Sequence, residues 1–98
     1  MRSAKTLLKM TEKEKALEVL PKWFEGDVYE LGDEVRNPYS GETVLLDAAE
    51  LSMYDAIKGA EMVMLMNIGC LDACIDIINR GSDWFLIKNP NAYMILLD

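Results

Sequence analysis

The 98-residue sequence contains no histidine and only two cysteines, Cys70 and Cys74. Histidine is the side chain that most often acts as a general base near neutral pH, so a cysteine or serine nucleophile would lack its usual activating partner. The two cysteines lie one helical turn apart in an apolar segment, and with no second pair they match neither a zinc site nor a disulfide framework. We interpret them as small buried core thiols, and we expect no enzyme activity, no metal and no cofactor.

Long apolar runs are also absent. The longest run in the central helical segment extends only from Met62 to Met66, whereas a bilayer span needs roughly 20 residues. Near the basic N-terminus only Leu7 and Leu8 stand between the cations, although a secretory signal requires a continuous apolar stretch of about 7 to 15 residues. We therefore expect a cytoplasmic protein that does not bind membrane.

Positive charge is scarce, with 10 Lys and Arg against 17 Asp and Glu, which gives a net charge of −7. The excess is concentrated in residues 25–50, where Arg36 is the single cation among the acidic residues. These acidic residues are Glu25, Asp27, Glu30, Asp33, Glu34, Glu42, Asp47 and Glu50. Such a field repels nucleic acid and attracts basic proteins, so we expect no direct nucleic-acid binding. The simpler interpretation is a solvated acidic surface that maintains solubility.

The chain is long enough for one domain, and its 51% hydrophobic content is high for that size. We expect a flexible basic arm over residues 1–10 and a single helical domain over residues 11–98. Thr11 and Glu14 have capping-box spacing, which predicts a helix over residues 11–24. Because Pro21 lies inside this pattern, the helix either kinks there or ends just before it.

A change of hydrophobic period after Gly26 indicates β structure. The segment from Asn37 to Gly41 reads Asn-Pro-Tyr-Ser-Gly, which is typical of a tight turn, because proline presets the first central torsion and glycine tolerates a positive φ. It predicts a hairpin over residues 34–46, with strands near 34–36 and 43–46. An isolated hairpin is only marginally stable, so we expect it to lie on the helices.

Asp47 and Glu50 form a second capping-box pair, which predicts a helix over residues 47–66. Asn67, Ile68 and Gly69 favour a break after it, because Asn and Gly are good C-cap residues, although one long helix over residues 47–80 is the alternative.

A further helix is expected over residues 70–88. Gly81 and Ser82 are capping candidates within it, but the helix can also run through them. Asn89 and Pro90 are suited to the start of a last helix over residues 90–97. The fold class is therefore mostly α with a short β-hairpin, an α+β arrangement.

Apolar residues at helical spacing predict the packed face of these helices. The expected stripe contains Met53, Ile57, Ala60, Met64 and Ile68, and continues in phase through Leu71, Ile75 and Ile78. Met62 and Met66 point away from it, and methionine-rich faces adapt well to partners. The apolar tail of residues 93–97 must dock on its own core or on a neighbour. We expect interaction residues at these places and at the hairpin tip: Tyr39, Met62, Met66, Trp84, Tyr93, Met94 and Leu97.

Two residue pairs have the outline of a catalytic site. Tyr54 and Lys58 reproduce the Tyr-x-x-x-Lys spacing of short-chain dehydrogenases, but the chain has no glycine-rich dinucleotide-binding unit. Asp72 and Asp76 lie one helical turn apart and would share a hard cation if Glu50 or Glu61 faced them. We interpret both pairs as helix-surface residues.

Several segments together resemble a group of small uncharacterised proteins encoded by bacteriophages, particularly marine ones. They are Gly26-Asp27-Val28, Asn37 to Gly41, Glu50 to Asp55, Asp83-Trp84-Phe85, Asn89-Pro90 and Tyr93 to Asp98, within residues 26–98. The resemblance implies a phage source but no activity, cofactor or catalytic residue.

The first hypothesis is a non-catalytic accessory protein that binds protein and forms a homo-oligomer, through the helix of residues 50–66 and the C-terminal tail. The alternative is an acidic inhibitor or nucleic-acid mimic that uses residues 25–50 to occupy a basic host protein. The third hypothesis is an enzyme in which carboxylates hold a metal ion.

Overall fold

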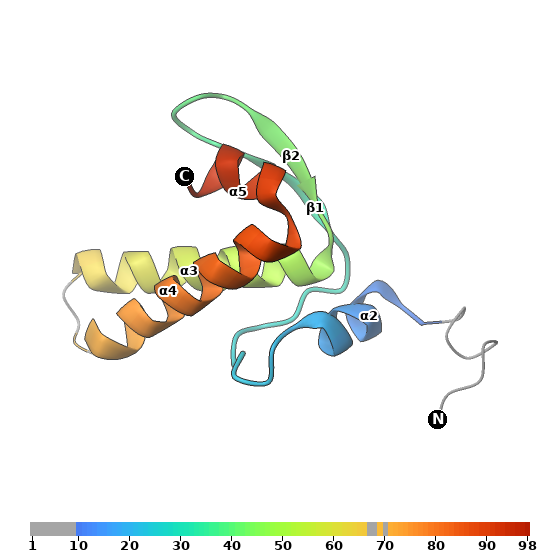
Figure 1. Cartoon of the computed structure of the whole chain (residues 1–98), viewed down its shortest axis with the longest axis horizontal. Helices are drawn as coiled ribbons and strands as arrows, with labels where there is room; N and C mark the ends of the chain where they lie inside the picture. The colour runs from blue at the N-terminus through green and yellow to red at the C-terminus, as the bar shows by residue number, and fades with distance from the viewer. Residues whose placement is uncertain (1–9, 67–68, 70) are drawn as a thin grey trace.

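The structure is a computed structural model that describes residues 10–66, 69 and 71–98. The elements are α2 (Glu12–Val19), β1 (Asp33–Arg36), β2 (Thr43–Leu46), α3 (Ala48–Met66), α4 (Leu71–Lys88) and α5 (Pro90–Leu96) (Figure 1). The predicted fold class, mostly helical with one antiparallel hairpin, is confirmed. Of the expected N-terminal arm, only Met10 belongs to the described residues. None of the described helices is both long enough and apolar enough to cross a bilayer.

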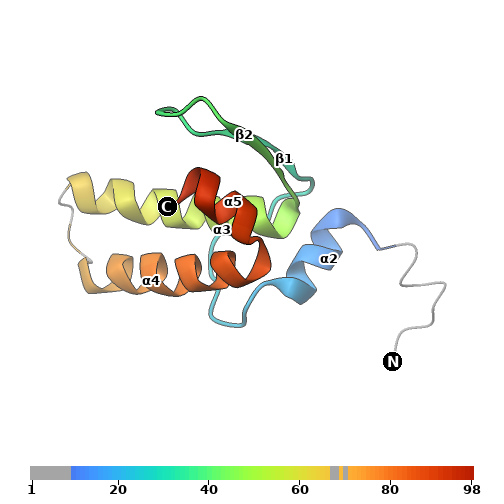
Figure 2. The ribbon, with the colours of Figure 1, turned by 45° about the horizontal axis from the view of Figure 1, so that its top comes forward.

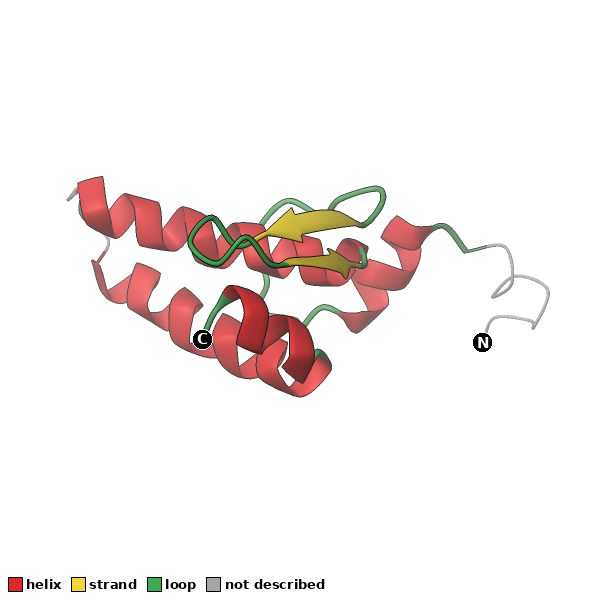
Figure 3. Cartoon of the chain, turned by 90° about the horizontal axis from the view of Figure 1, so that it is seen from above, coloured by secondary structure: helices red, strands yellow, loops and turns green. Residues whose placement is uncertain are grey.

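The centre of the fold is the antiparallel pair of α3 and α4, which pack side by side. The β-hairpin and α5 lie over one side of this pair, while α2 packs where α3 begins (Figure 2). Seen from above, the far end of the pair, toward the α3–α4 connection, extends past α5 and the hairpin (Figure 3). We call this the distal end, residues 61–66 of α3 and 71–78 of α4.

The helix α2 begins with the predicted capping box and ends earlier than expected. The Thr11 hydroxyl accepts the backbone N–H of Glu14 at 3.1 Å, and the Glu14 carboxylate accepts the N–H of Thr11 at 3.4 Å. The helix ends at Val19 rather than at residue 24. Leu20 is already extended, with φ −64° and ψ 143°, because Pro21 disfavours helical torsions in the residue before it. Of the two alternatives, termination before the proline is therefore correct.

The hairpin has the predicted turn and strands. Val35 pairs with Val44, and Asp33 with Leu46. The Oδ1 of Asn37 accepts two backbone N–H groups of the turn, from Tyr39 at 2.8 Å and from Ser40 at 3.2 Å. Gly41 has φ +80°, which a residue with a Cβ rarely adopts.

The same asparagine also attaches the turn to the end of the chain. Its Nδ2 donates to the backbone carbonyl of Ile95 in α5 at 2.8 Å. Since Val35, Val44, Tyr93 and Ile95 are all partly buried against the core, the hairpin lies on the helices as expected.

The second capping box is also present. The Asp47 carboxylate accepts the N–H of Glu50 at 2.8 Å, and the Glu50 carboxylate accepts the N–H of Asp47 at 2.9 Å. The chain from Ala48 to Lys88 forms two helices rather than one, which confirms the break. Gly69 lies in this connection with φ +96°. Asn67 and Ile68, the other two residues of the expected break, lie outside the described residues.

The helix α4 runs through Gly81 and packs on α3 with a face that differs from the predicted one. Its buried residues are Cys74, Gly81 and Phe85. Leu71 and Ile75, which were expected to continue the buried stripe, are 54% and 39% exposed. The reason is Gly81: without a side chain it allows α4 to approach Ile57 and Met53 of α3 closely, and this approach fixes which side of α4 is inside.

The core forms where all the elements meet. It contains the buried residues Ala16, Leu20, Leu46, Ala48, Ala49, Met53, Ile57, Phe85, Ala92 and Leu96. The C-terminal tail thus docks on its own core, one of the two outcomes expected for it. Cys74 is buried as predicted, while Cys70 lies outside the described residues.

Candidate interaction surface

Five large apolar side chains are exposed at the distal end of the α3–α4 pair, and we call them the distal surface. They are Met62 (62% exposed), Leu65 (87%), Met66 (62%), Leu71 (54%) and Ile75 (39%). Scattered single exposed hydrophobic residues are normal, but several on the neighbouring ends of two packed helices are typical of a contact site.

The distal surface is exposed because the other elements all pack elsewhere on the pair. The buried side chains of α3 lie between Ala48 and Ala60, and none of its described residues beyond Ala60 is buried. The hairpin and α5 contact α3, α4 and each other at the opposite end. No described part of the chain therefore buries any of these five side chains.

A depression runs into the distal surface between the two helices. It has a volume of about 380 Å³ and is lined by Glu61, Met64 and Leu65 of α3 and by Ile78 of α4. Of the lining residues, Met64 and Ile78 are half-buried apolar side chains, and Glu61 contributes a charge. An apolar centre with a charged rim is the usual composition of a protein–protein interface.

The structure places the predicted interaction residues in two groups. Tyr39 at the hairpin turn is 98% exposed, Met94 on α5 is 59% exposed, and Met62 and Met66 lie on the distal surface. Three others are half-buried because they pack on the core of their own chain: Trp84, Tyr93 and Leu97. Trp84 also contacts Phe85 edge to face, with 6.2 Å between the ring centroids. Only Met62 and Met66 are brought together with other exposed apolar residues.

Leu65, Leu71 and Ile75 were not predicted as interaction residues. Leu65 falls outside the apolar stripe of α3, and this position is the one signal in the sequence that distinguishes it from a core residue. Leu71 and Ile75 have the spacing of core residues, and only the position of α4 against α3 shows that they are exposed.

Gly59, in the middle of α3, is exposed, and no neighbouring atom requires a glycine at this position. A Cβ atom added there would meet no atom within 4 Å, and its backbone is helical with no positive φ. Glycine in a helix interior costs about 0.5–1 kcal/mol relative to alanine. Gly59, Met62 and Met66 have i, i+3 and i+7 spacing, so they share one side of α3.

Acidic groups dominate the surface around the hairpin. Three carboxylates there form no ion pair with any described residue: Asp33, Glu34 and Glu42. Next to them is a groove of about 520 Å³, whose lining includes Leu31, Leu45 and Asp47. Leu31 and Leu45 are 67% and 73% exposed, so the groove combines exposed apolar side chains with acidic groups.

A buried polar network joins the start of α3 to the α4–α5 junction. Glu50 is only 6% exposed, and its carboxylate accepts Nδ2 of Asn89 at 3.0 Å. The Nζ of Lys88 lies 3.2 Å from an Asp47 oxygen and 3.6 Å from a Glu50 oxygen. Burial lowers the pKa of Lys88, but the hydrogen bond and charge of Asp47, followed by those of Glu50, outweigh it and raise that pKa. The network is structural, because its carboxylate oxygens are already satisfied.

Tyr29 fastens the loop before the hairpin to the outer side of α3. Its N–H donates to the Ser52 hydroxyl at 3.0 Å, and that hydroxyl donates to the Ala48 carbonyl at 2.6 Å. The negative charge of Asp55 raises the pKa of Tyr29, with smaller contributions from desolvation and from the hydrogen bond to Asp55. The phenol is therefore kept protonated.

Three of the four residues in the two candidate catalytic pairs make other contacts on the helix surface. Lys58 lies 5.7 Å from the centre of the Tyr54 ring, a cation–π contact, and pairs with Glu61 at 3.3 Å. Asp76 pairs with Arg80 at 3.0 Å. Within residues 10–66, 69 and 71–98, no three carboxylate, cysteine or histidine side chains are grouped so that they could hold a metal ion.

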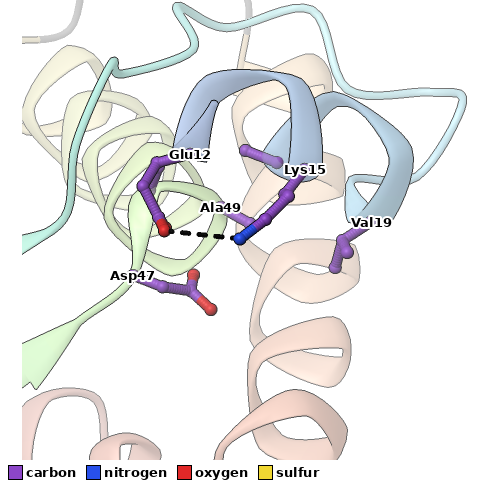
Figure 4. Close-up of a pocket in the computed structure, with 7 residues that line it drawn as sticks. Glu12, Lys15, Val19, Asp47 and Ala49 are labelled. Carbon is purple, nitrogen blue, oxygen red and sulfur yellow. Dashed lines mark ion pairs between the residues drawn. The ribbon is translucent and has the colours of Figure 1, made fainter. Parts of the chain in front are cut away.

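A cavity lies between α2 and the start of α3, beside the second capping box (Figure 4). It measures about 220 Å³, below the roughly 300–1,000 Å³ of typical ligand pockets. Alanines form much of its lining, and at its edge Lys15 and Glu12 pair with each other at 3.9 Å. It lacks both the size and the unpaired polar groups of a substrate site.

Comparisons with known protein families, with curated proteins and with solved structures find no match to this chain. The function is therefore inferred from the geometry and charge of the chain itself.

Proposed function

We propose that this protein is a non-catalytic accessory protein that acts by binding protein and associates with itself through the distal surface. The observation that carries the proposal is the group of five exposed apolar side chains, Met62, Leu65, Met66, Leu71 and Ile75, at an end of the helix pair that no described element covers. Their burial in an interface would be favourable by roughly 25 cal/mol for each Å² of apolar area removed from water.

A second copy of the chain is a suitable partner for this surface. Two-fold symmetric dimers bring the same patch of each subunit together, so an apolar patch on one copy meets an apolar patch on the other. The two methionines adapt their shape to a facing surface more readily than branched residues do.

Sedimentation velocity of the full chain over roughly 1–100 μM tests self-association, because dimers of moderate affinity dissociate within this range. Met62→Lys should shift the protein to monomer, because it places a charge in the interface. The matched control is Ile87→Lys, since Ile87 is 84% exposed on α4 but lies outside the distal surface. A wild-type protein that stays monomeric at every concentration would refute the proposal.

The phage-type source is part of the same proposal and depends on the resemblance over residues 26–98. It predicts that the genes next to the one encoding this chain encode phage proteins. A gene neighbourhood made up of cellular metabolic genes would contradict it.

A second candidate function is an acidic inhibitor that binds a basic protein at its nucleic-acid site. It is favoured by the unpaired carboxylates near the hairpin and by the adjacent groove with Leu31 and Leu45, because a basic surface with apolar side chains would find both kinds of partner there. Binding of this kind weakens as salt screens the charges.

Pull-down from host lysate at low and high salt distinguishes the two functions. The inhibitor should capture a basic protein at low salt and lose it at high salt. The double variant Asp33→Asn with Glu34→Gln should reduce the capture, whereas Met62→Lys should leave it unchanged. Capture that survives high salt, or that depends on Met62, would exclude the acidic surface as the binding site.

A further inference from the structure

We infer that a cavity beside the segment that follows α2 binds a small organic amine, with the apolar body of the amine inside the cavity and its ammonium group at the carboxylate of Glu25. Three features of the molecule support this site, and none of them depends on the distal surface or on self-association. They are the size and lining of the cavity, the way its aromatic residues are held, and the single charge in its lining.

The cavity lies between residues 23–26 and the two central helices. It has a volume of about 290 Å³ and is lined by Trp23, Phe24, Glu25 and Gly26, together with Ala56 of α3 and Ile77 of α4. This volume is close to the lower limit of roughly 300 Å³ for typical ligand pockets, and an apolar cavity of about 150 Å³ is enough to bind benzene. The space therefore suits a molecule whose body is the size of one ring.

Two small residues leave this space open. Ala56, with a single methyl group, is the residue that α3 contributes to the lining. A Cβ atom on Gly26 would stand 2.8 Å from Cζ of Phe24, so the phenylalanine ring lies directly against the glycine backbone. Atoms that line a cavity lack van der Waals contacts on one side unless something occupies it. An apolar ligand would supply those contacts.

The aromatic residues of the lining are held by the fold itself. The N–H of Phe24 donates to the carbonyl of Pro21 at 3.0 Å and closes a turn in which the proline ring fixes φ. Trp23 and Phe24 are both partly buried against the hydrophobic core. A site whose side chains are already ordered loses little conformational entropy on binding, and this favours even a small ligand.

The charge of the lining selects a cation. Glu25 is the one charged residue among the lining residues, and it is exposed. It forms no ion pair with any residue that the structure describes, and this includes Lys22, which lines a neighbouring depression together with it. A carboxylate pairs with an ammonium group, and aromatic rings are also attractive neighbours for a cation. The net charge of −7 adds a general attraction for cations.

Benzylamine and benzyl alcohol test this site, because they have nearly the same shape and differ in charge. Titrated into the isotope-labelled full chain and followed by NMR, benzylamine should shift the amide signals of Gly26, Ala56 and Ile77. Its dissociation constant should be about threefold lower than that of benzyl alcohol, the gain expected from an exposed ion pair. Equal dissociation constants would overturn the assignment of an amine. Shifts that avoid these three amides would overturn the site.

Two variants separate the charge from the cavity. Glu25→Gln should raise the dissociation constant of benzylamine to that of benzyl alcohol, whereas the matched control Glu42→Gln, on the hairpin, should leave both constants unchanged. Ala56→Leu should fill the cavity and weaken both ligands at least tenfold, whereas Met62→Lys, on the same helix but outside the cavity, should not. If Ala56→Leu does not fold, the wild-type shifts and Glu25→Gln decide. Unchanged binding of benzylamine to Glu25→Gln would refute the role of this carboxylate.

A lysine side chain has the same chemistry as the proposed ligand, an apolar stem that ends in an ammonium group. Nα-acetyl-lysine N-methylamide, titrated in the same way, distinguishes the two sources. It should bind more weakly than benzylamine, because a linear stem fills less of the cavity than a ring does. Equal or tighter binding would overturn the assignment of a free amine in favour of a lysine on a partner protein.

Discussion

Gly81 of α4 and Ile57 of α3 pack so closely that a Cβ atom on the glycine would stand 2.8 Å from Cγ1 of the isoleucine. Ile57 is completely buried, as is Met53, whose sulfur would lie 3.2 Å from the same atom. An added Cβ atom would therefore force these two core side chains to shift. The distance between the two central helices is thus set by the absence of one methyl group.

Gly81→Ala should therefore destabilise the protein, although alanine is the better helix former. We expect the free energy of unfolding to fall by about 1–3 kcal/mol, the usual cost of overpacking a core. Gly59→Ala is the internal control, and should raise it by about 0.5–1 kcal/mol when measured on the monomer. Urea unfolding of the two variants measures both. Equal effects of the same sign would show that Gly81 has no special packing role.

Glu50→Ala should cost about 1–3 kcal/mol of unfolding free energy, because it leaves partly buried donors of Asp47 and Asn89 without their acceptor. Glu50→Gln should cost less, since glutamine also completes a capping box. Thermal and urea unfolding of both variants provide the measurement. A Glu50→Gln variant as unstable as Glu50→Ala would mean that the negative charge opposite Lys88, and not the hydrogen bonding, stabilises this corner.

Alkaline pH should weaken the ion pairs of Lys88 with Asp47 and Glu50. The folded-state pKa of Lys88 is raised above its ordinary value of 10.5, so the protonated lysine stabilises the fold fully below that value. As pH rises through the raised pKa, this contribution is lost. The difference in unfolding free energy between the wild type and Lys88→Met should therefore shrink above about pH 10.5 and be constant between neutral pH and that value. A difference that grows with pH would contradict the assigned ion pairs.

Asn37→Ala should loosen the hairpin, because it removes the acceptor for two turn N–H groups and the donor to the Ile95 carbonyl. We expect a loss of about 1–2 kcal/mol of unfolding free energy. Asn37→Asp separates the two roles: it keeps the turn acceptor and loses only the donor. If the contact with α5 matters, hydrogen exchange should be faster in α5 for both variants, but faster in the turn for Asn37→Ala alone.

The phenol of Tyr29 should ionise above its ordinary pKa of 10.0 because Asp55 lies beside it. Asp55→Asn removes the charge that is the main cause, so the pKa of Tyr29 should move down toward the ordinary value. The difference between ultraviolet absorbance titrations of matched proteins with tyrosine and with phenylalanine at position 29 isolates this group from the other tyrosines. A pKa that does not respond to Asp55→Asn would show that the loop is not attached to α3 in this way.

The features that the sequence predicted well are those determined by a few neighbouring residues. Thr11 with Glu14 and Asp47 with Glu50 satisfy their own backbone donors, so each helix start could be identified without knowledge of the fold. The turn at Asn37 and the last helix at Asn89 are local in the same sense. The end of α2 was predicted too late, because the apolar periodicity continues past Pro21 whereas the helical backbone ends before it.

The phase of α4 and the distal surface could not be predicted in this way. Leu71 and Ile75 have the spacing of core residues, and only the close contact of Gly81 with Ile57 turns that side of α4 outward. A glycine in a helical pattern is equally consistent with a cap, a packing contact or an exposed position. Gly81 and Gly59 have the same sequence character, and tertiary structure alone distinguishes a contact inside the chain from open space.

The hydrogen bond from Asn37 to the Ile95 carbonyl has a consequence for the order in which the chain becomes ordered during translation. The ribosome completes the turn long before it makes Ile95, and Asn89, which binds Glu50, also emerges late. Until those residues leave the exit tunnel, the hairpin lacks its contacts with α5 and keeps only its own pairing and its contacts with α3. A nascent chain stalled before residue 89 should therefore present a hairpin that is only partly anchored to chaperones and proteases.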